Sequence, residues 1–273
     1  MANWFVSDAG RHAMGGHVAA TSTLTGVTAS VSANTPGAWV QMYASTPFPA
    51  SMVSVFTGNA GIFVSAQNSQ TLFDIGIGPP TQQILIQNVA IGGNAQFARW
   101  DFPISVASGS QLWLRLRSLV GSKSCIFGMR LAGGGMGLEA GGLAVTYGAV
   151  QASSRGTILN TPTSTHVKAS TWTVISAATS APMRWLSLGL AAPNTATSTA
   201  SNGLLDIGVG ALGQETVIVP DIPYRTSTAE DILGAFPMVY PVNVPSGVRL
   251  VARHQASSTS AASVPNLTIT GIC

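Results

Sequence analysis

The chain has 273 residues with a formal net charge of +3 at pH 7, and only 8% of its residues are charged. The length suits two domains of ordinary size, while the charged fraction is far below the ~25% of a typical soluble domain. The basic residues form no run, so binding to nucleic acid or to an anionic membrane is not expected. No stretch of about 18 apolar residues occurs, so no membrane-spanning helix is expected, and the N-terminus has no signal-peptide pattern.

This composition predicts a soluble chain made in a cytoplasm, with a surface of neutral polar and small residues. Such a surface suits a protein held in an assembly, where little of it meets free solvent. It equally suits an extracellular β-protein.

In chain order, residues 1–34 come first. They are rich in Gly, Ala, Ser and Thr without strong periodicity, and they predict an extended N-terminal arm with room for one short strand. Residues 35–131 then carry short runs of β-branched and aromatic residues, each bounded by turn residues, as strands do. The predicted strands of this first domain are 38–44, 51–56, 61–65, 71–77, 83–89, 102–106, 111–117 and 124–131.

Residues 132–167 are glycine-rich and predict a linker, within which 143–147 could pair locally. Residues 168–273 return to short β-type runs. The predicted strands of this second domain are 171–177, 184–190, 203–209, 215–219, 240–244, 248–254 and 265–272. The one candidate for a helical turn is 228–234, capped by Ser227 or Thr228 and closed by Gly234.

The second domain repeats the first. The segment 72–78, Leu-Phe-Asp-Ile-Gly-Ile-Gly, returns 132 residues later as Leu-Leu-Asp-Ile-Gly-Val-Gly at 204–210. Further matches keep their order along the chain, and the slips in spacing fall where loops are expected. Short strands about ten residues apart in each copy predict an all-β fold of two tandem, duplicated antiparallel β-sandwiches of jelly-roll type.

Two charged positions recur in both copies. Asp74 and Asp206 occupy the same place inside apolar strands, and Arg115 is equivalent to Arg253. Because a carboxylate among apolar residues needs a partner, we expect structural pairs between Asp74 and Arg115 and between Asp206 and Arg253. A carboxylate site is the competing interpretation, but a duplicated enzyme rarely needs two identical sites in one chain.

No motif predicts catalysis. Residues 208–213 fit the Gly-x-Gly-x-x-Gly pattern, yet a strand-like segment follows where a dinucleotide site needs a helix, so a turn between strands is expected. The histidines lack the spacing of metal ligands, and the adjacent acids Glu230 and Asp231 are expected in a solvated loop. We therefore expect no enzyme activity, no cofactor and no metal.

The two cysteines, Cys125 and Cys273, are too few for a disulfide framework. One buried thiol and one C-terminal thiol are expected, and a bridge between them stays open.

The aromatic residues divide into two groups. Trp39 and Trp172 are equivalent in the two copies and are expected in the cores, whereas Trp100 has no counterpart. Arg99 and Trp100, within the segment Phe-Ala-Arg-Trp-Asp-Phe at 97–102, form a candidate contact surface. Tyr224 and Arg225 are the corresponding candidates in the second copy. Burial of Trp100 beneath the sandwich is the competing interpretation.

These features together resemble virion proteins of tailed bacteriophages. The resemblance is carried by the arm, the two tandem sandwiches, the low charge, and motifs such as Leu-Leu-Asp-Ile-Gly-Val-Gly at 204–210 and Val-Pro-Ser-Gly-Val-Arg-Leu-Val-Ala-Arg at 244–253. It implies a structural virion component, first of all a capsid cement or decoration protein that binds the major capsid protein or another virion protein.

The resemblance further implies a virion location after synthesis in the cytoplasm of a bacterial host. It implies a homo-oligomer, with a trimer favoured, and an arm that lies on neighbouring subunits. The alternative is a carbohydrate-binding or adhesin module, such as a tail receptor-binding protein, and a hydrolase on a jelly-roll scaffold comes third.

Overall fold

The computed structural model describes residues 11–15, 25–57, 70–78, 83–91, 98–133, 141–191, 199–226, 232–234 and 239–273. Within these ranges the chain is all-β, with nineteen strands in four sheets of antiparallel pairs. The only helices there are two 3-10 turns, Gln151–Ser153 (η1) and Ala261–Ser263 (η2). In the same ranges, no helix has the length and apolar character needed to cross a membrane.

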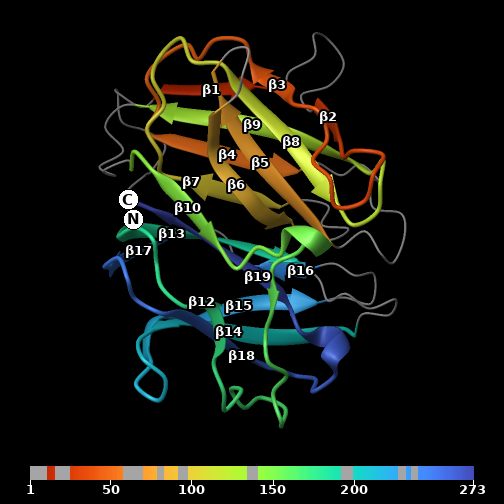
Figure 1. The fold of residues 1–273 in the computed structure, drawn as a ribbon, viewed down its shortest axis with the longest axis vertical. Coiled ribbons are helices and arrows are strands. Elements are labelled where there is room, and N and C mark those ends of the chain that lie inside the picture. The colour runs from red at the N-terminus through yellow and green to blue at the C-terminus, as the bar shows by residue number, and fades with distance from the viewer. Residues whose placement is uncertain are drawn as a thin grey trace.

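The first sandwich fills the upper part of Figure 1 and consists of two facing sheets. One sheet has the order β1-β9-β4-β7, with β2 also paired to β9, and the other has the order β3-β8-β5-β6. The strands are β1 (Arg11–Gly15), β2 (Thr25–Thr28), β3 (Val40–Tyr43), β4 (Met52–Thr57), β5 (Thr71–Ile77), β6 (Gln83–Ile91), β7 (Arg99–Phe102), β8 (Leu112–Ser118) and β9 (Ser124–Gly133).

The second sandwich lies below the first in Figure 1 and is again built from two sheets. One has the order β10-β19-β13-β17, with β11 also paired to β19, and the other has the order β12-β18-β14-β15-β16. The strands are β10 (Ala144–Tyr147), β11 (Thr157–Ile158), β12 (Thr173–Ser176), β13 (Met183–Ala191), β14 (Ser201–Val209), β15 (Thr216–Thr226), β16 (Ile232–Gly234), β17 (Val239–Val244), β18 (Leu250–Ala256) and β19 (Asn266–Ile272).

The two sandwiches share one topology, which confirms the predicted fold of two tandem duplicated β-sandwiches. The order β3-β8-β5-β6 returns as β12-β18-β14-β15, and β9-β4-β7 returns as β19-β13-β17. The agreement extends to single hydrogen bonds. The amide of Thr46 donates to the carbonyl of Ser110 at 2.8 Å, and the amide of Thr179 donates to the carbonyl of Val248 at 2.8 Å.

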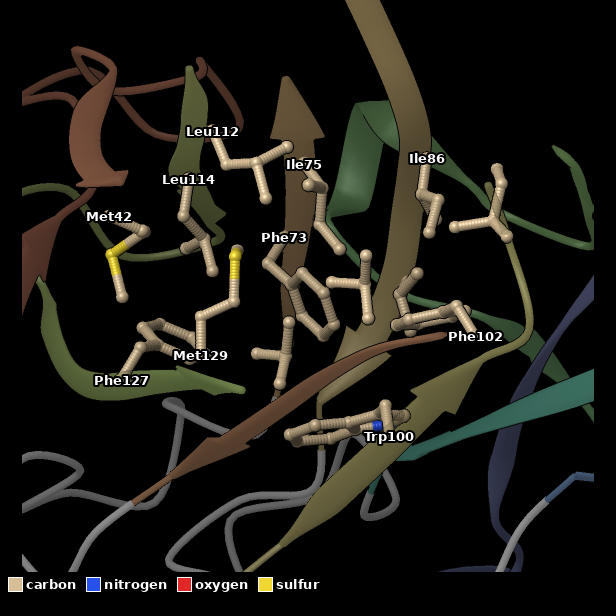
Figure 2. Close-up of a cluster of buried hydrophobic side chains, with 14 of the residues drawn as sticks. Met42, Phe73, Ile75, Ile86, Trp100, Phe102, Leu112, Leu114, Phe127 and Met129 are labelled. Carbon is tan, nitrogen blue, oxygen red and sulfur yellow. The ribbon is translucent and has the colours of Figure 1, made fainter. Parts of the chain in front are cut away.

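Each sandwich closes over its own apolar core, because its strands alternate inward and outward side chains. In β8, for example, Leu112, Leu114 and Leu116 are fully buried while Trp113 and Arg115 are not. Figure 2 shows Phe73 at the centre of the first core with the ring of Trp100 beneath it; the two ring centroids are 5.1 Å apart. Burying side chains of this size stabilises the fold by roughly 1.5–3 kcal/mol each.

The predicted arm and linker do not stand apart from the sandwiches. Within the arm, β1 and β2 both pair with β9, and Val27 is fully buried in the first core. Within the predicted linker, β10 and β11 pair with β19. The boundaries at 34 and 167 are therefore corrected, because these low-charge, glycine-rich segments complete sheets with strands far away in the sequence.

Two predicted elements also differ. The strand predicted at 102–106 lies earlier, as β7, and residues 104 and 106 form only isolated bridges. The described end of the candidate helical turn, Ile232–Gly234, is strand β16 paired to β15. The strand predicted at 61–65 lies outside the described residues.

The two sandwiches are packed directly against each other. The edge strands of the first, β6 and β7, lie against the sheet β10-β19-β13-β17 of the second. The backbone amide of Ala90 on β6 donates to the Thr268 hydroxyl at 2.9 Å. The approach is so close at Gly189 that a Cβ there would lie 2.7 Å from the backbone of Ala90. The second sandwich thus covers an edge that would otherwise expose unpaired backbone groups.

We expect Thr268→Val to lower the free energy of unfolding by about 1–2 kcal/mol, because it leaves the buried Ala90 amide without an acceptor. Hydrogen exchange at the Ala90 amide should also accelerate. Thr163→Val, at an exposed position, is the matched control and should change neither. Unchanged exchange at Ala90 would contradict this account of the contact.

Candidate functional site

The repeated motif at 204–210 builds a charged cluster on the outward face of β14. Asp206 is 3% exposed and sits opposite Arg253 of β18. The Arg253 Nε donates to Asp206 Oδ2 at 3.1 Å, and the amide of Asp221, at an irregularity in β15, donates to Asp206 Oδ1 at 3.0 Å. The positive φ of Asp221, 52°, turns this amide toward the carboxylate.

The glycines of the motif have separate uses. The Arg253 guanidinium lies 4.4 Å above the ring of Trp172, and the edge of that ring lies over Gly208, where a Cβ would approach it to 2.9 Å. Gly210 ends the strand with a φ of 131°, a conformation that L side chains rarely adopt. In the pattern Asp-x-Gly-x-Gly, the aspartate thus binds the arginine, the first glycine leaves room for the tryptophan ring, and the second glycine allows the turn.

The first sandwich repeats this arrangement around Asp74. The Arg115 Nε donates to Asp74 Oδ2 at 2.7 Å, and the Asn88 amide donates to Asp74 Oδ1 at 2.7 Å. Arg115 lies 4.4 Å above the ring of Trp39. These are the Asp–Arg partners expected from the sequence. Trp39 and its equivalent Trp172, expected in the cores, instead lie half-buried on the outward faces under an arginine.

In the second cluster a lysine also contacts the carboxylate. The Lys168 ammonium lies 2.6 Å from Asp206 Oδ1 and 2.9 Å from Asp221 Oδ1. Burial opposes ionisation of Asp206, but the bonds from the Asp221 amide, Lys168 and Arg253 outweigh it and hold the pKa of this carboxyl below its usual value. The Asp206 carboxylate therefore links three neighbouring strands, β14, β15 and β18.

The candidate contact surface is wrong for two of its four residues. Trp100 is 2% exposed and packs in the first core, and Tyr224 is 4% exposed in the second core. Arg99 pairs with Asp101 at 2.9 Å, while Arg225 is exposed on the second sandwich. The four residues belong to two different sandwiches, so they do not form one surface.

Tyr224 has a buried polar partner that the sequence did not indicate. Its hydroxyl lies 2.5 Å from Nδ1 of His254, which is fully buried. Burial lowers the pKa of His254 from 6.5 to about 4, although the neighbouring backbone of Asn160 acts in the opposite direction. Strand pairing places Ile91 and Leu116 at the equivalent positions of the first sandwich. A comparison of the two copies could therefore have marked Tyr224 and His254 as unusual.

The remaining sequence motifs resolve as follows. Residues 208–213 lead from β14 into β15, so the glycine pattern forms a turn between strands. Within the described ranges, no group of three or more His, Cys, Asp or Glu side chains could hold a metal ion. Cys125 is buried, Cys273 is partly buried, and both are free thiols. Glu230 and Asp231 lie outside the described residues.

An open pocket of about 500 Å³ lies on the second sandwich. Strands β14, β15 and β18 form it together with the segment that precedes β12. It is lined by His166, Asn202, Gly203, Leu204, Pro223, Tyr224, Arg225, Gln255, Ala256 and Ser257. Of these, only Tyr224 and Arg225 were candidates from the sequence.

No protein-family model matches the chain, and no curated protein matches it. Three solved structures match it at low similarity. PNGF-II has 9% identity and a TM-score of 0.32 over 91% of this chain, which spans 65% of the length of PNGF-II. The major capsid protein P2 of bacteriophage PM2 has 6% identity and a TM-score of 0.35, with 96% of this chain and 98% of P2 covered.

PNGase F, a glycosylasparaginase from Flavobacterium meningosepticum, has 6% identity and a TM-score of 0.32, with 97% of this chain and 96% of that chain covered. A capsid protein and an enzyme thus stand at the same distance from this chain. Similarity at this level carries no argument about function.

Proposed function

We propose that the chain is a structural component of a virus particle, and specifically a cement or decoration protein that binds the major capsid protein. The observation that supports this most directly is that its described carboxylates are held in ion pairs. The described residues include five acids, Asp74, Asp101, Asp206, Glu215 and Asp221, and each is held in an ion pair with an arginine or lysine. Acids engaged in this way stabilise a scaffold, and none of these five described acids is left unpaired for acid–base chemistry.

Two further features favour this role over that of an enzyme. The sandwiches form one block through the contact of β6 and β7 with the second sandwich, and a rigid block suits a shell component. The low charge of the chain suits a surface that is largely covered by neighbours. On this proposal the chain is a closed homo-oligomer, with a trimer favoured.

Three measurements test the proposal. Light scattering over a range of concentrations should give a stable closed oligomer, and protein mass spectrometry of particles purified from the host should find the chain in a copy number comparable with the major capsid protein. Particles that lack the chain should lose heat stability. Absence of the chain from purified particles would reject the proposal.

Removal of residues 1–34 is not a clean test of an assembly arm. Val27 and Ala29 belong to the first core, so this deletion would also damage the sandwich. A shorter deletion that ends before β1 leaves both β1 and β2 in the sheet and so separates assembly from folding.

A further inference from the structure

The pocket occupies a place that is covered in the first sandwich. Leu204 pairs with Gln255 and Pro223 in the second sandwich, as Leu72 pairs with Arg117 and Ala90 in the first. The His166 amide donates to the Ala256 carbonyl at 2.8 Å, as the Asn34 amide donates to the Ser118 carbonyl at 2.7 Å. His166, Leu204, Pro223 and Gln255 are therefore the counterparts of Asn34, Leu72, Ala90 and Arg117.

In the first sandwich, the surface formed by these counterparts packs against the second sandwich. Leu72 and Ala90 pack with Ala191 in a small apolar cluster. The Ser154 hydroxyl donates to Asn34 Oδ1 at 2.9 Å, and Arg117 Nη1 lies 3.4 Å from Gln151 Oε1.

Another copy of the chain cannot cover the pocket in the same way. Pro223 has no amide to donate, whereas its counterpart Ala90 bonds Thr268 through its amide. The close approach also depends on Gly189, and the equivalent residue on β4 of the first sandwich is Phe56. The second sandwich of another copy could not cover the pocket in this way either. Its Gly189 and Thr268 already contact Ala90 in the first sandwich of their own chain.

The pocket also has the wrong chemistry for such a contact. Besides Tyr224 and Ser257, which bond to His254 and Ser201, four polar side chains line it, those of His166, Asn202, Arg225 and Gln255. None of them makes a side-chain hydrogen bond or ion pair to another residue within the described ranges. Leu204 and Pro223 add an apolar floor between them, and the volume falls in the ~300–1,000 Å³ range of small-molecule sites.

We propose that this pocket binds a sugar that carries a carboxylate group. Arg225 is the only charged lining residue, and a guanidinium binds a carboxylate through two parallel hydrogen bonds. Carboxamides and an imidazole both donate and accept, as sugar hydroxyls do. The apolar floor suits the C–H face of a sugar ring. This inference is independent of the proposed virion role.

The test compares glucuronic acid, glucose and glucose 6-phosphate by calorimetry and by ligand-observed NMR. We expect saturable binding of glucuronic acid, with affinity for glucose about tenfold lower, since glucose lacks the charge-assisted bonds. Glucose 6-phosphate should also bind more weakly than glucuronic acid.

The variants locate the site. Arg225→Gln should weaken glucuronic acid about tenfold and remove its advantage over glucose. Asn202→Ala should weaken both sugars by a similar factor. Lys123→Gln removes the same charge from the first sandwich and should change nothing. Melting temperatures of all variants should match the parent, which shows that the fold is intact.

The inference would be overturned by no saturable binding of glucuronic acid, by unchanged binding in Arg225→Gln, or by glucose binding as tightly as glucuronic acid. Tighter binding of glucose 6-phosphate would also overturn it, since the site would then select phosphate. None of these outcomes bears on the presence of the chain in particles.

Discussion

Replacement of Asp206 by Asn should lower the free energy of unfolding by about 3 kcal/mol. The carboxylate accepts from Lys168, Arg253 and the Asp221 amide, and the neutral amide would leave two cations close together without their common counter-charge. The full cost of breaking a buried pair is about 3–5 kcal/mol. Lys168 and Arg253 are 18% and 29% exposed, so water offsets part of it.

The duplication supplies the comparison for this prediction. Asp74→Asn breaks one ion pair, with Arg115, and should cost less, about 2 kcal/mol. Asp221→Asn removes a carboxylate whose side chain is 63% exposed and should cost below about 1 kcal/mol. Urea unfolding followed by circular dichroism measures all three. Equal stability of Asp206→Asn and the parent would show that this cluster does not hold the sheet.

Acidification from pH 6.5 to pH 4 should lower the free energy of unfolding by about 3 kcal/mol through His254 alone. Its pKa is lowered from 6.5 to about 4 in the folded protein because the ring is buried. Below pH 6.5 the unfolded chain therefore binds a proton that the folded chain still excludes. The stabilisation is fully present above pH 6.5, and it is lost progressively as the pH falls toward 4.

A double variant, His254→Leu with Tyr224→Phe, isolates this effect. Leucine occupies the equivalent position of the first sandwich as Leu116, and the phenylalanine avoids a buried hydroxyl without a partner. Stability of this variant should be nearly flat between pH 6.5 and 5. Below that, Glu215 adds a loss of its own, because the bond from Arg249 holds the pKa of this carboxyl below its ordinary value of 4.5. The lowered pKa of Asp206 acts in a separate window, at and below its ordinary value of 3.8. A double variant as acid-sensitive as the parent would assign the loss to other groups.

The Asp–Arg pairs were predictable from the sequence for a physical reason. A charge inside an apolar strand has few ways to be satisfied, and the same two charges recur in two copies of one unit. The pocket was not predictable in this way, because its lining residues come from three strands and a loop, and none is unusual in its local sequence. Only the strand pairing shows that they stand where the first sandwich is covered.

The sequence by itself determined the all-β class, the duplication, most strands and the Asp74 and Asp206 pairs, because these depend on local alternation and on the repeat. The tertiary structure decided which segments complete the sheets, so that β1, β2, β10 and β11 belong to the sandwiches rather than to an arm and a linker. It also decided exposure: Trp100 and Tyr224 turn inward, while Trp39 and Trp172 turn outward beneath arginines. A shift of one residue in register reverses the face of a strand, and that register is fixed by partners far away in the sequence.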